Sequence, residues 1–160
     1  MGLVCELQRD ALNQDVFASD LLRKAMVVAR KLSVPDMQVW VEHELSGYMT
    51  GEEVPKYRII QGELRCLNPY RGEIPMYIQD RGLRDTLTRR RCEQSIAEIE
   101  ELIRQHHEHG SKGSVVMSVP HDVGCKLLGD SHEGIHPPAL HFPVAQLVCI
   151  VDAVRSYVLE

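Results

Sequence analysis

The sequence predicts a mainly helical α+β fold. Apolar residues recur at helical spacing through most of the first fifty positions and again from Val144 to the end. Between Tyr57 and Ile78 the pattern changes to the alternation that is typical of strands. Only 8 of the 160 residues are aromatic, so we expect an aliphatic core. This length predicts one domain, residues 1–160, that buries about two-thirds of its unfolded surface.

Three packed helices are expected at the N-terminus. The first runs from Leu3 to about Leu12. Ser19 and Asp20 provide N-cap chemistry for a second helix that reaches Leu32. Ser33–Asp36 is expected to form the N-terminal cap of a third helix, with Pro35 in its first turn, and Gly47 and Gly51 are expected to end that helix.

The segment Tyr57–Ile78 is predicted to be an antiparallel hairpin. Turn-forming residues (Asn68, Pro69 and Gly72) separate its two alternating runs. Pro75 lies within the second run and cannot donate a backbone hydrogen bond, so that run is predicted to be an edge strand.

The second half mixes short elements with two longer helices. We expect a short helix plus loop over Asp80–Arg91, and then a helix that starts near Ile96 and ends at Gly110. Strands are expected over Ser114–Val119 and Ala139–Phe142, with a short helix between them. The last helix is expected to be amphipathic, with its apolar side formed by Leu147, Val148, Val151, Val154, Tyr157 and Val158.

Charge and cysteine content exclude several classes of protein. Lys plus Arg is 18 and Asp plus Glu is 23, a net charge of −5 that argues against non-specific binding to nucleic acid. No apolar run approaches the ~20 residues of a membrane span. The five cysteines are scattered without paired spacing, which predicts reduced, mostly buried thiols in a cytoplasmic protein and no cofactor.

Histidines provide the sharpest alternative. The string His132-Glu133-Gly-Ile-His136 fits H-E-x-x-H, in which two histidines bind zinc and the glutamate is the general base of a hydrolase. That chemistry needs a helix, whereas Gly134 interrupts the string and Pro137 disfavours helical geometry at His136. We therefore expect a polar loop, with a metal-dependent hydrolase or toxin as the alternative. His106 and His109 would share a helix face that could bind a metal, but the expected role is to complement the helix dipole.

Basic and aromatic residues supply the candidate interaction sites. The main concentration of positive charge comprises Arg81, Arg84, Arg89, Arg90 and Arg91. Guanidinium groups can bind phosphate, but in an acidic chain a solvated loop or an interface with an acidic partner is the stronger expectation. Trp40 and Tyr48 are expected to be core or interface anchors.

Several segments resemble the AbiTii family of bacterial abortive-infection proteins. The resemblance covers most of residues 3–105 and is carried by Asp20–Ala25, Val28–Leu32, Trp40–Tyr48, Val54–Arg58, Gly62, Asn68–Tyr70 and Ser95–Glu100. The matching residues have the character of fold and turn determinants, and Glu44 and Arg58 could form a buried ion pair.

The resemblance implies a role in phage defence, in which infected cells stop growing or die before the phage matures. It also implies an N-terminal module of a longer protein, an expectation that agrees with the abrupt end at Glu160. We therefore expect a non-catalytic module that self-associates or docks a fused or associated effector, in response to a phage-derived trigger. A symmetric homo-oligomer is the simplest assembly, and no membrane or nucleic-acid partner is expected.

Overall fold

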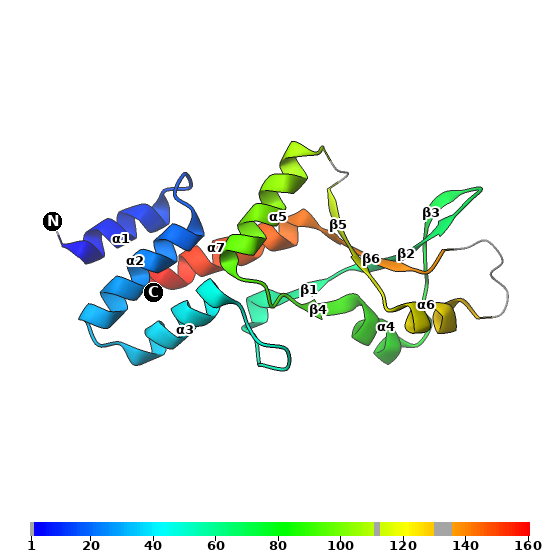
Figure 1. Cartoon of the computed structure of the whole chain (residues 1–160), viewed down its shortest axis with the longest axis horizontal. Coiled ribbons are helices and arrows are strands. Elements are labelled where there is room, and N and C mark those ends of the chain that lie inside the picture. The colour runs from blue at the N-terminus through cyan, green and yellow to red at the C-terminus, as the bar shows by residue number, and fades with distance from the viewer. Residues whose placement is uncertain (1, 111–112, 130–135) are drawn as a thin grey trace.

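A computed structural model describes residues 2–110, 113–129 and 136–160. Its α+β architecture has a helical body at one end and small antiparallel sheets at the other (Figure 1). The helical body contains α1 (Leu3–Leu12), α2 (Ala18–Lys31), α3 (Pro35–Ser46), α5 (Ile96–Glu108) and α7 (Val144–Leu159). The fold class predicted from the sequence is therefore confirmed.

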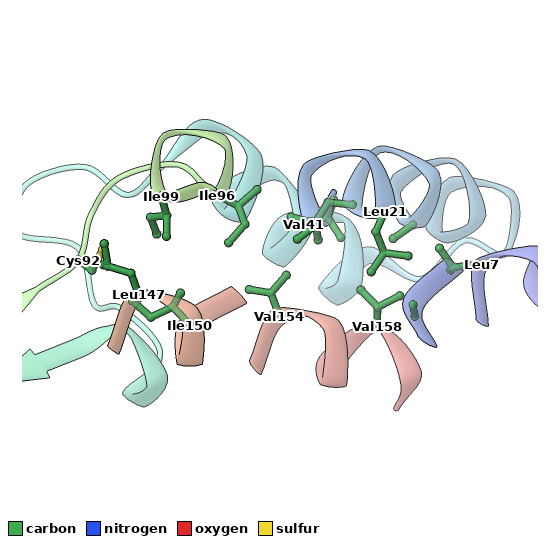
Figure 2. Close-up of a cluster of buried hydrophobic side chains, with 14 of the residues drawn as sticks. Leu7, Leu21, Val41, Cys92, Ile96, Ile99, Leu147, Ile150, Val154 and Val158 are labelled. Atoms are coloured by element: carbon green, nitrogen blue, oxygen red, sulfur yellow. The ribbon is translucent and has the colours of Figure 1, made fainter. Parts of the chain in front are cut away.

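The core of the helical body lies around α7. This helix contacts α1, α2 and α5, and it brings the C-terminal end of the chain beside the N-terminal helices (Figure 1). Figure 2 shows the aliphatic side chains that these helices and α3 bury together, among them Leu7, Leu21, Val41, Ile96, Ile99, Ile150 and Val154. The prediction of an aliphatic core is confirmed.

The caps of the helices differ in part from those expected. The carboxylate of Glu100, on α5, accepts hydrogen bonds from the backbone N–H groups of Ala18 and Ser19 at the start of α2. The predicted capping by Ser19 and Asp20 is therefore wrong, because a distant carboxylate satisfies the free N–H groups. α5 begins with a capping box in which Ser95 and Glu98 bond reciprocally.

Two sheets form the other end of the molecule. In the larger sheet the order is β3 (Gly72–Pro75), β2 (Glu63–Asn68), β6 (Ala139–Pro143) and β5 (Ser114–Ser118), and all pairs are antiparallel. The smaller sheet pairs β1 (Ile59–Gln61) with β4 (Arg89–Arg91). The short helices η1 (Lys56–Arg58), α4 (Arg81–Thr88) and α6 (His121–Leu128) complete the described elements.

The predicted hairpin is only partly present. β2 and β3 do form an antiparallel hairpin, and β3 is an edge strand as Pro75 predicts. β1 instead pairs with β4, so the arginine triplet expected in a loop lies in a strand. Sequence alternation cannot identify this pairing, because the partners are about thirty residues apart and each strand has three residues.

The buried side of α7 also differs from the prediction. Val148 and Tyr157 are 40% and 49% exposed, whereas Ile150 is fully buried. The helix is apolar on both sides, so periodicity alone did not identify which side faces the core.

Cysteine burial and membrane propensity complete the comparison. All five thiols are free, but only Cys66 and Cys92 are buried, so the expectation of mostly buried cysteines is wrong. Within the described residues, no helix combines the length and apolar character needed to cross a bilayer.

Candidate functional site

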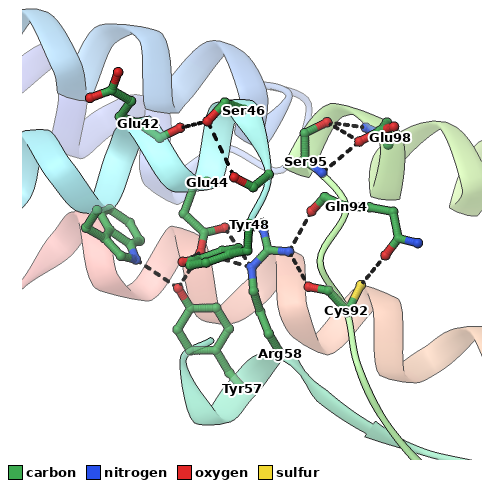
Figure 3. Close-up of polar contacts among 12 residues, drawn as sticks. Glu42, Glu44, Ser46, Tyr48, Tyr57, Arg58, Cys92, Gln94, Ser95 and Glu98 are labelled. Carbon is green, nitrogen blue, oxygen red and sulfur yellow. Dashed lines mark hydrogen bonds and ion pairs between the residues drawn. The ribbon is translucent and has the colours of Figure 1, made fainter. Parts of the chain in front are cut away.

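A fully buried ion pair joins α3 to η1, the short helix that leads into β1 of the smaller sheet. Glu44 lies on the inner side of α3, and Arg58 ends η1. The Arg58 Nε atom lies 3.0 and 3.2 Å from the two carboxylate oxygens of Glu44, and both side chains are completely buried (Figure 3). The ion pair expected from the sequence is confirmed. Because the two opposite charges attract each other in this contact, the ion pair offsets part of the desolvation penalty of burying them.

Two tyrosines complete the hydrogen bonding of the Glu44 carboxylate. The hydroxyls of Tyr48 and Tyr57 donate to Oε1 of Glu44 at 2.8 and 2.7 Å, and the indole N–H of Trp40 donates to the Tyr57 hydroxyl at 2.8 Å (Figure 3). Burial and the nearby charge of Glu44 raise the pKa of both tyrosines, so they remain donors even above the pH near 10 at which an ordinary tyrosine ionises. We call Trp40, Glu44, Tyr48, Tyr57 and Arg58 the Glu44 network.

Arg58 also fixes the segment that leads into α5. Its NH1 group donates to the carbonyl oxygens of Cys92 and Gln94 at 2.9 and 2.6 Å. The Tyr48 ring lies 5.0 Å from the guanidinium carbon, a cation–π contact. Close approach on this side also requires Gly47, because a Cβ there would lie 2.8 Å from the Glu93 carbonyl oxygen and φ is +88°. The network therefore connects three segments that are separate in the sequence.

An open hollow lies over the aromatic part of the network. Its volume is about 520 Å³, and its lining includes Trp40, His43 and Tyr48 from the α3 region and Lys56 from η1. The Trp40 ring stacks on Tyr157 of α7 with centroids 5.5 Å apart. The structure thus brings both predicted aromatic anchors, Trp40 and Tyr48, to one surface feature.

The arginines do not converge on one site. Arg81 begins α4, and Arg84 lines a hollow of about 290 Å³ beside β2. Arg89–Arg91 instead line another hollow, of about 190 Å³, beside Ile59. Across the described ranges, none of these five side chains forms an ion pair. Their predicted role in binding an acidic partner or a phosphate stays a prediction.

A further hollow was missed by the sequence reasoning. It has a volume of about 400 Å³ and is bounded by α5, α7 and the connection between α1 and α2. Its apolar lining consists of Val16, Phe17, Ile103, Val148 and Val151, and we call it the α5–α7 hollow. Phe17 is 61% exposed there. The signal in the sequence is the low charge of α7, with only Asp152 and Arg155 in 16 residues.

The AbiTii family model matches residues 2–160. The chain belongs to the AbiTii family. No curated protein and no solved structure matches it. The family name indicates abortive infection, a bacterial defence against phage.

The residues that suggested AbiTii from the sequence now have physical roles. Trp40, Glu44, Tyr48, Tyr57 and Arg58 make up the Glu44 network. In this AbiTii chain they hold the helical body to the sheets, as fold determinants would. Gly62 allows a close approach to β6, because a Cβ there would lie 2.7 Å from the His141 carbonyl oxygen.

The histidine motifs of this AbiTii chain are only partly described. His132 and Glu133 lie outside the described residues, while His136 is exposed and its backbone N–H donates to Leu67. The metal-dependent alternative therefore stays a prediction. His106 and His109 both line a hollow beside β5, as their shared face predicts. Over residues 2–110, 113–129 and 136–160, no three metal-ligating side chains form a group that could hold a metal.

Proposed function

We propose that this AbiTii domain is a non-catalytic interaction module of an anti-phage defence protein. It self-associates and controls an associated effector through its outer surface. The observation that carries the proposal is the exposed apolar side of α7 and the adjoining α5–α7 hollow.

α7 has the character of a helix that is covered on both sides. Its inner side buries Leu147, Ile150, Val154 and Val158 in the core. Its outer side exposes Ala145, Val148 and Cys149, and beyond them Asp152 and Ser156. Ala145, Val148 and Cys149 extend the apolar surface of the helix beyond the side that faces the core, as on a helix that packs against more than one neighbour. The outer side is therefore suited to a protein partner.

The α5–α7 hollow adds the anatomy of an interface. An exposed aromatic, Phe17, stands beside aliphatic Val148, and the polar residues Glu100, Arg104 and Arg155 lie among the lining. Apolar anchors within a polar rim are typical of protein interfaces. The guanidinium of Arg155 also donates to the carbonyls of Asn13 and Val16, which fixes the loop that carries Phe17. The surface is thus held in place before a partner binds.

Control of the effector follows from mass action. A phage component that binds one assembly state more tightly shifts the population toward that state. The effector associated with that state then becomes active or inactive without any chemistry in this domain.

The proposal is tested with Val148→Asp in cells that carry the complete defence system. Phage plating efficiency should rise toward that of undefended cells, because a carboxylate in the hollow opposes burial by the effector. The matched control is Val27→Asp, since Val27 is a 47% exposed valine on α2 that lies outside the hollow. It should leave protection intact. Full protection by the Val148→Asp variant would contradict effector docking at α7.

Self-association is tested by light scattering of the purified domain across a dilution series. We expect a discrete oligomer that persists on dilution. A mass of 18.2 kDa, that of one chain, at every concentration would overturn this part of the proposal.

A further inference from the structure

The outer edges of the two sheets differ in how they are protected from pairing with another strand. An unpaired edge presents backbone donors and acceptors, and proteins usually block such edges with charge, proline or a covering group. The two sheets have four outer edges, formed by β1, β4, β3 and β5. Three of these strands carry such a feature.

The three protected edges use different means. β3 contains Pro75 and the charged Glu73. β4 consists of three arginines, so pairing with a second β4 would bring like charges together. β1 is covered by the Gln146 side-chain amide, which accepts from the Gln61 N–H at 2.8 Å and donates to its carbonyl at 2.5 Å.

β5 has none of these features. Its sequence, Ser114-Val-Val-Met-Ser118, contains no charge and no proline. Among the described residues, its hydrogen bonds are those of its ladder with β6. Val115 and Met117 pack toward the core, whereas Val116 points to the other face of the sheet and is 56% exposed.

The β5 sequence is also self-complementary. If two β5 strands run antiparallel about a two-fold axis at Val116, that residue lies opposite its own copy. Val115 then faces Met117, and Ser114 faces Ser118. Each opposed pair is apolar with apolar or hydroxyl with hydroxyl, and no like charges meet. A two-fold axis requires this match, because each residue must suit its symmetry-related neighbour.

We propose that two copies of this chain pair through β5, antiparallel and centred on Val116. The proposal rests on the self-association part of the proposed function and specifies its interface. It joins two four-stranded sheets into one continuous sheet.

Cysteine cross-linking tests the register. In a background with Cys5, Cys125 and Cys149 replaced by serine, a Val116→Cys variant should form a covalent dimer under mild oxidation. Directly opposed residues have Cα atoms about 4.5–5.5 Å apart, within reach of a disulfide.

Ser118→Cys is the matched control in the same strand. By itself it should not cross-link, because its copies would lie about 13 Å apart along the strand. A mixture of Ser114→Cys and Ser118→Cys proteins should form the covalent heterodimer. Equal cross-linking of the Val116→Cys and Ser118→Cys variants would overturn the proposed register.

Val116→Lys tests whether this pairing holds the assembly together. The two ammonium groups would face each other at the axis, so the mass should fall to that of one chain, 18.2 kDa. Val27→Lys should leave the mass of the assembly unchanged.

The outcomes also separate this proposal from the wider one. An oligomer that survives Val116→Lys would overturn β5 pairing while self-association stands. A wild-type protein that is monomeric at every concentration would overturn both.

Discussion

Two arginine–carboxylate sites in this molecule share their chemistry but differ in burial and reach. Arg58 and Glu44 are completely buried, and together they connect α3, η1 and the segment before α5. Arg104 lies on the surface of α5 and pairs with Glu101 and Glu108 of the same helix. The first site holds distant segments in place, whereas the second adds contacts between neighbours on a helix that already exists.

The difference shows that the environment of an ion pair, not its chemistry, decides what its removal costs. Water replaces a lost partner at an exposed site. At a buried site no water is available, and the remaining charge keeps its desolvation penalty.

Removal of Glu44 should have the largest effect. Glu44→Ala leaves the Arg58 guanidinium buried without its carboxylate, so the free energy of unfolding should fall by about 3–5 kcal/mol. Urea denaturation followed by circular dichroism measures this loss. Glu44→Gln keeps the shape and one acceptor, and it should lose less.

Glu101→Ala is the matched control for Glu44→Ala. It removes the surface partner of Arg104, and the urea midpoint should stay close to that of the wild type. Similar losses from the Glu44→Ala and Glu101→Ala variants would show that burial does not separate the two sites.

Loss of a tyrosine hydroxyl should have the next largest effect. Tyr57→Phe removes a hydrogen bond to the Glu44 carboxylate, which contributes about 1.5–3 kcal/mol. It also leaves the Trp40 indole N–H without its acceptor. Tyr48→Phe removes only the bond to Glu44 and should therefore cost less.

Tyr77→Phe controls for the loss of a hydroxyl itself. Tyr77 is 79% exposed, and its hydroxyl makes no hydrogen bond with the described residues. The urea midpoint should not change. A loss from Tyr48→Phe greater than that from Tyr57→Phe would contradict the proposed role of Trp40.

Alkaline pH should weaken the stability that the two buried tyrosines, Tyr48 and Tyr57, provide. An unfolded tyrosine ionises near pH 10, but burial and then the charge of Glu44 raise the pKa of Tyr48 and Tyr57 in the folded protein. Above about pH 10 the unfolded chain therefore releases protons that the folded protein keeps. The free energy of unfolding should fall as the pH rises, by about 1.4 kcal/mol per pH unit for each tyrosine.

In the Tyr57→Phe variant, the free energy of unfolding should fall less steeply with pH, because one of the two tyrosines no longer contributes. The pKa values of Lys24, Cys66 and Cys92 are also raised, but they contribute equally to both proteins, so the difference isolates Tyr57. Urea titrations between pH 9 and about 11.5 measure the slopes. Parallel slopes for the wild type and the variant would contradict the raised pKa of Tyr57.

Most elements of the fold could be predicted from the sequence because their signals are local. Helix periodicity located α1, α2, α3, α5 and α7, and Pro75 identified the edge strand. The pairing of β1 with β4 and the cap that Glu100 provides for α2 could not be predicted in this way. Both depend on residues brought together only by the folded chain.

The candidate sites divide along the same line. The Glu44–Arg58 pair could be anticipated from the family resemblance, because these two are the polar residues among the matching fold determinants. The α5–α7 hollow was missed, because the apolar pattern of α7 predicts that it packs but not which side stays open. Phe17 lies in a connection between helices, where periodicity carries no information.

Salt should have the smallest effect, and it should act only at the surface site. Hydrogen bonds from Arg104 and Gln105 lower the pKa of Glu101 to about 2, although its side chain is exposed. At about 1 M NaCl the Debye length is about 3 Å, so the charge of Arg104 is screened and the Glu101 pKa should rise toward its ordinary value. NMR titration of the carboxyl group at low and high salt measures that rise. Any stability that the lowered pKa provides is present above its ordinary value of 4.5 and is lost as the pH falls toward about 2.

The buried site should respond differently, because salt does not reach Glu44. The loss of unfolding free energy caused by Glu44→Ala should be the same at both salt concentrations. If high salt reduced that loss, the Glu44 network would be open to solvent, and burial could not be what separates the two sites.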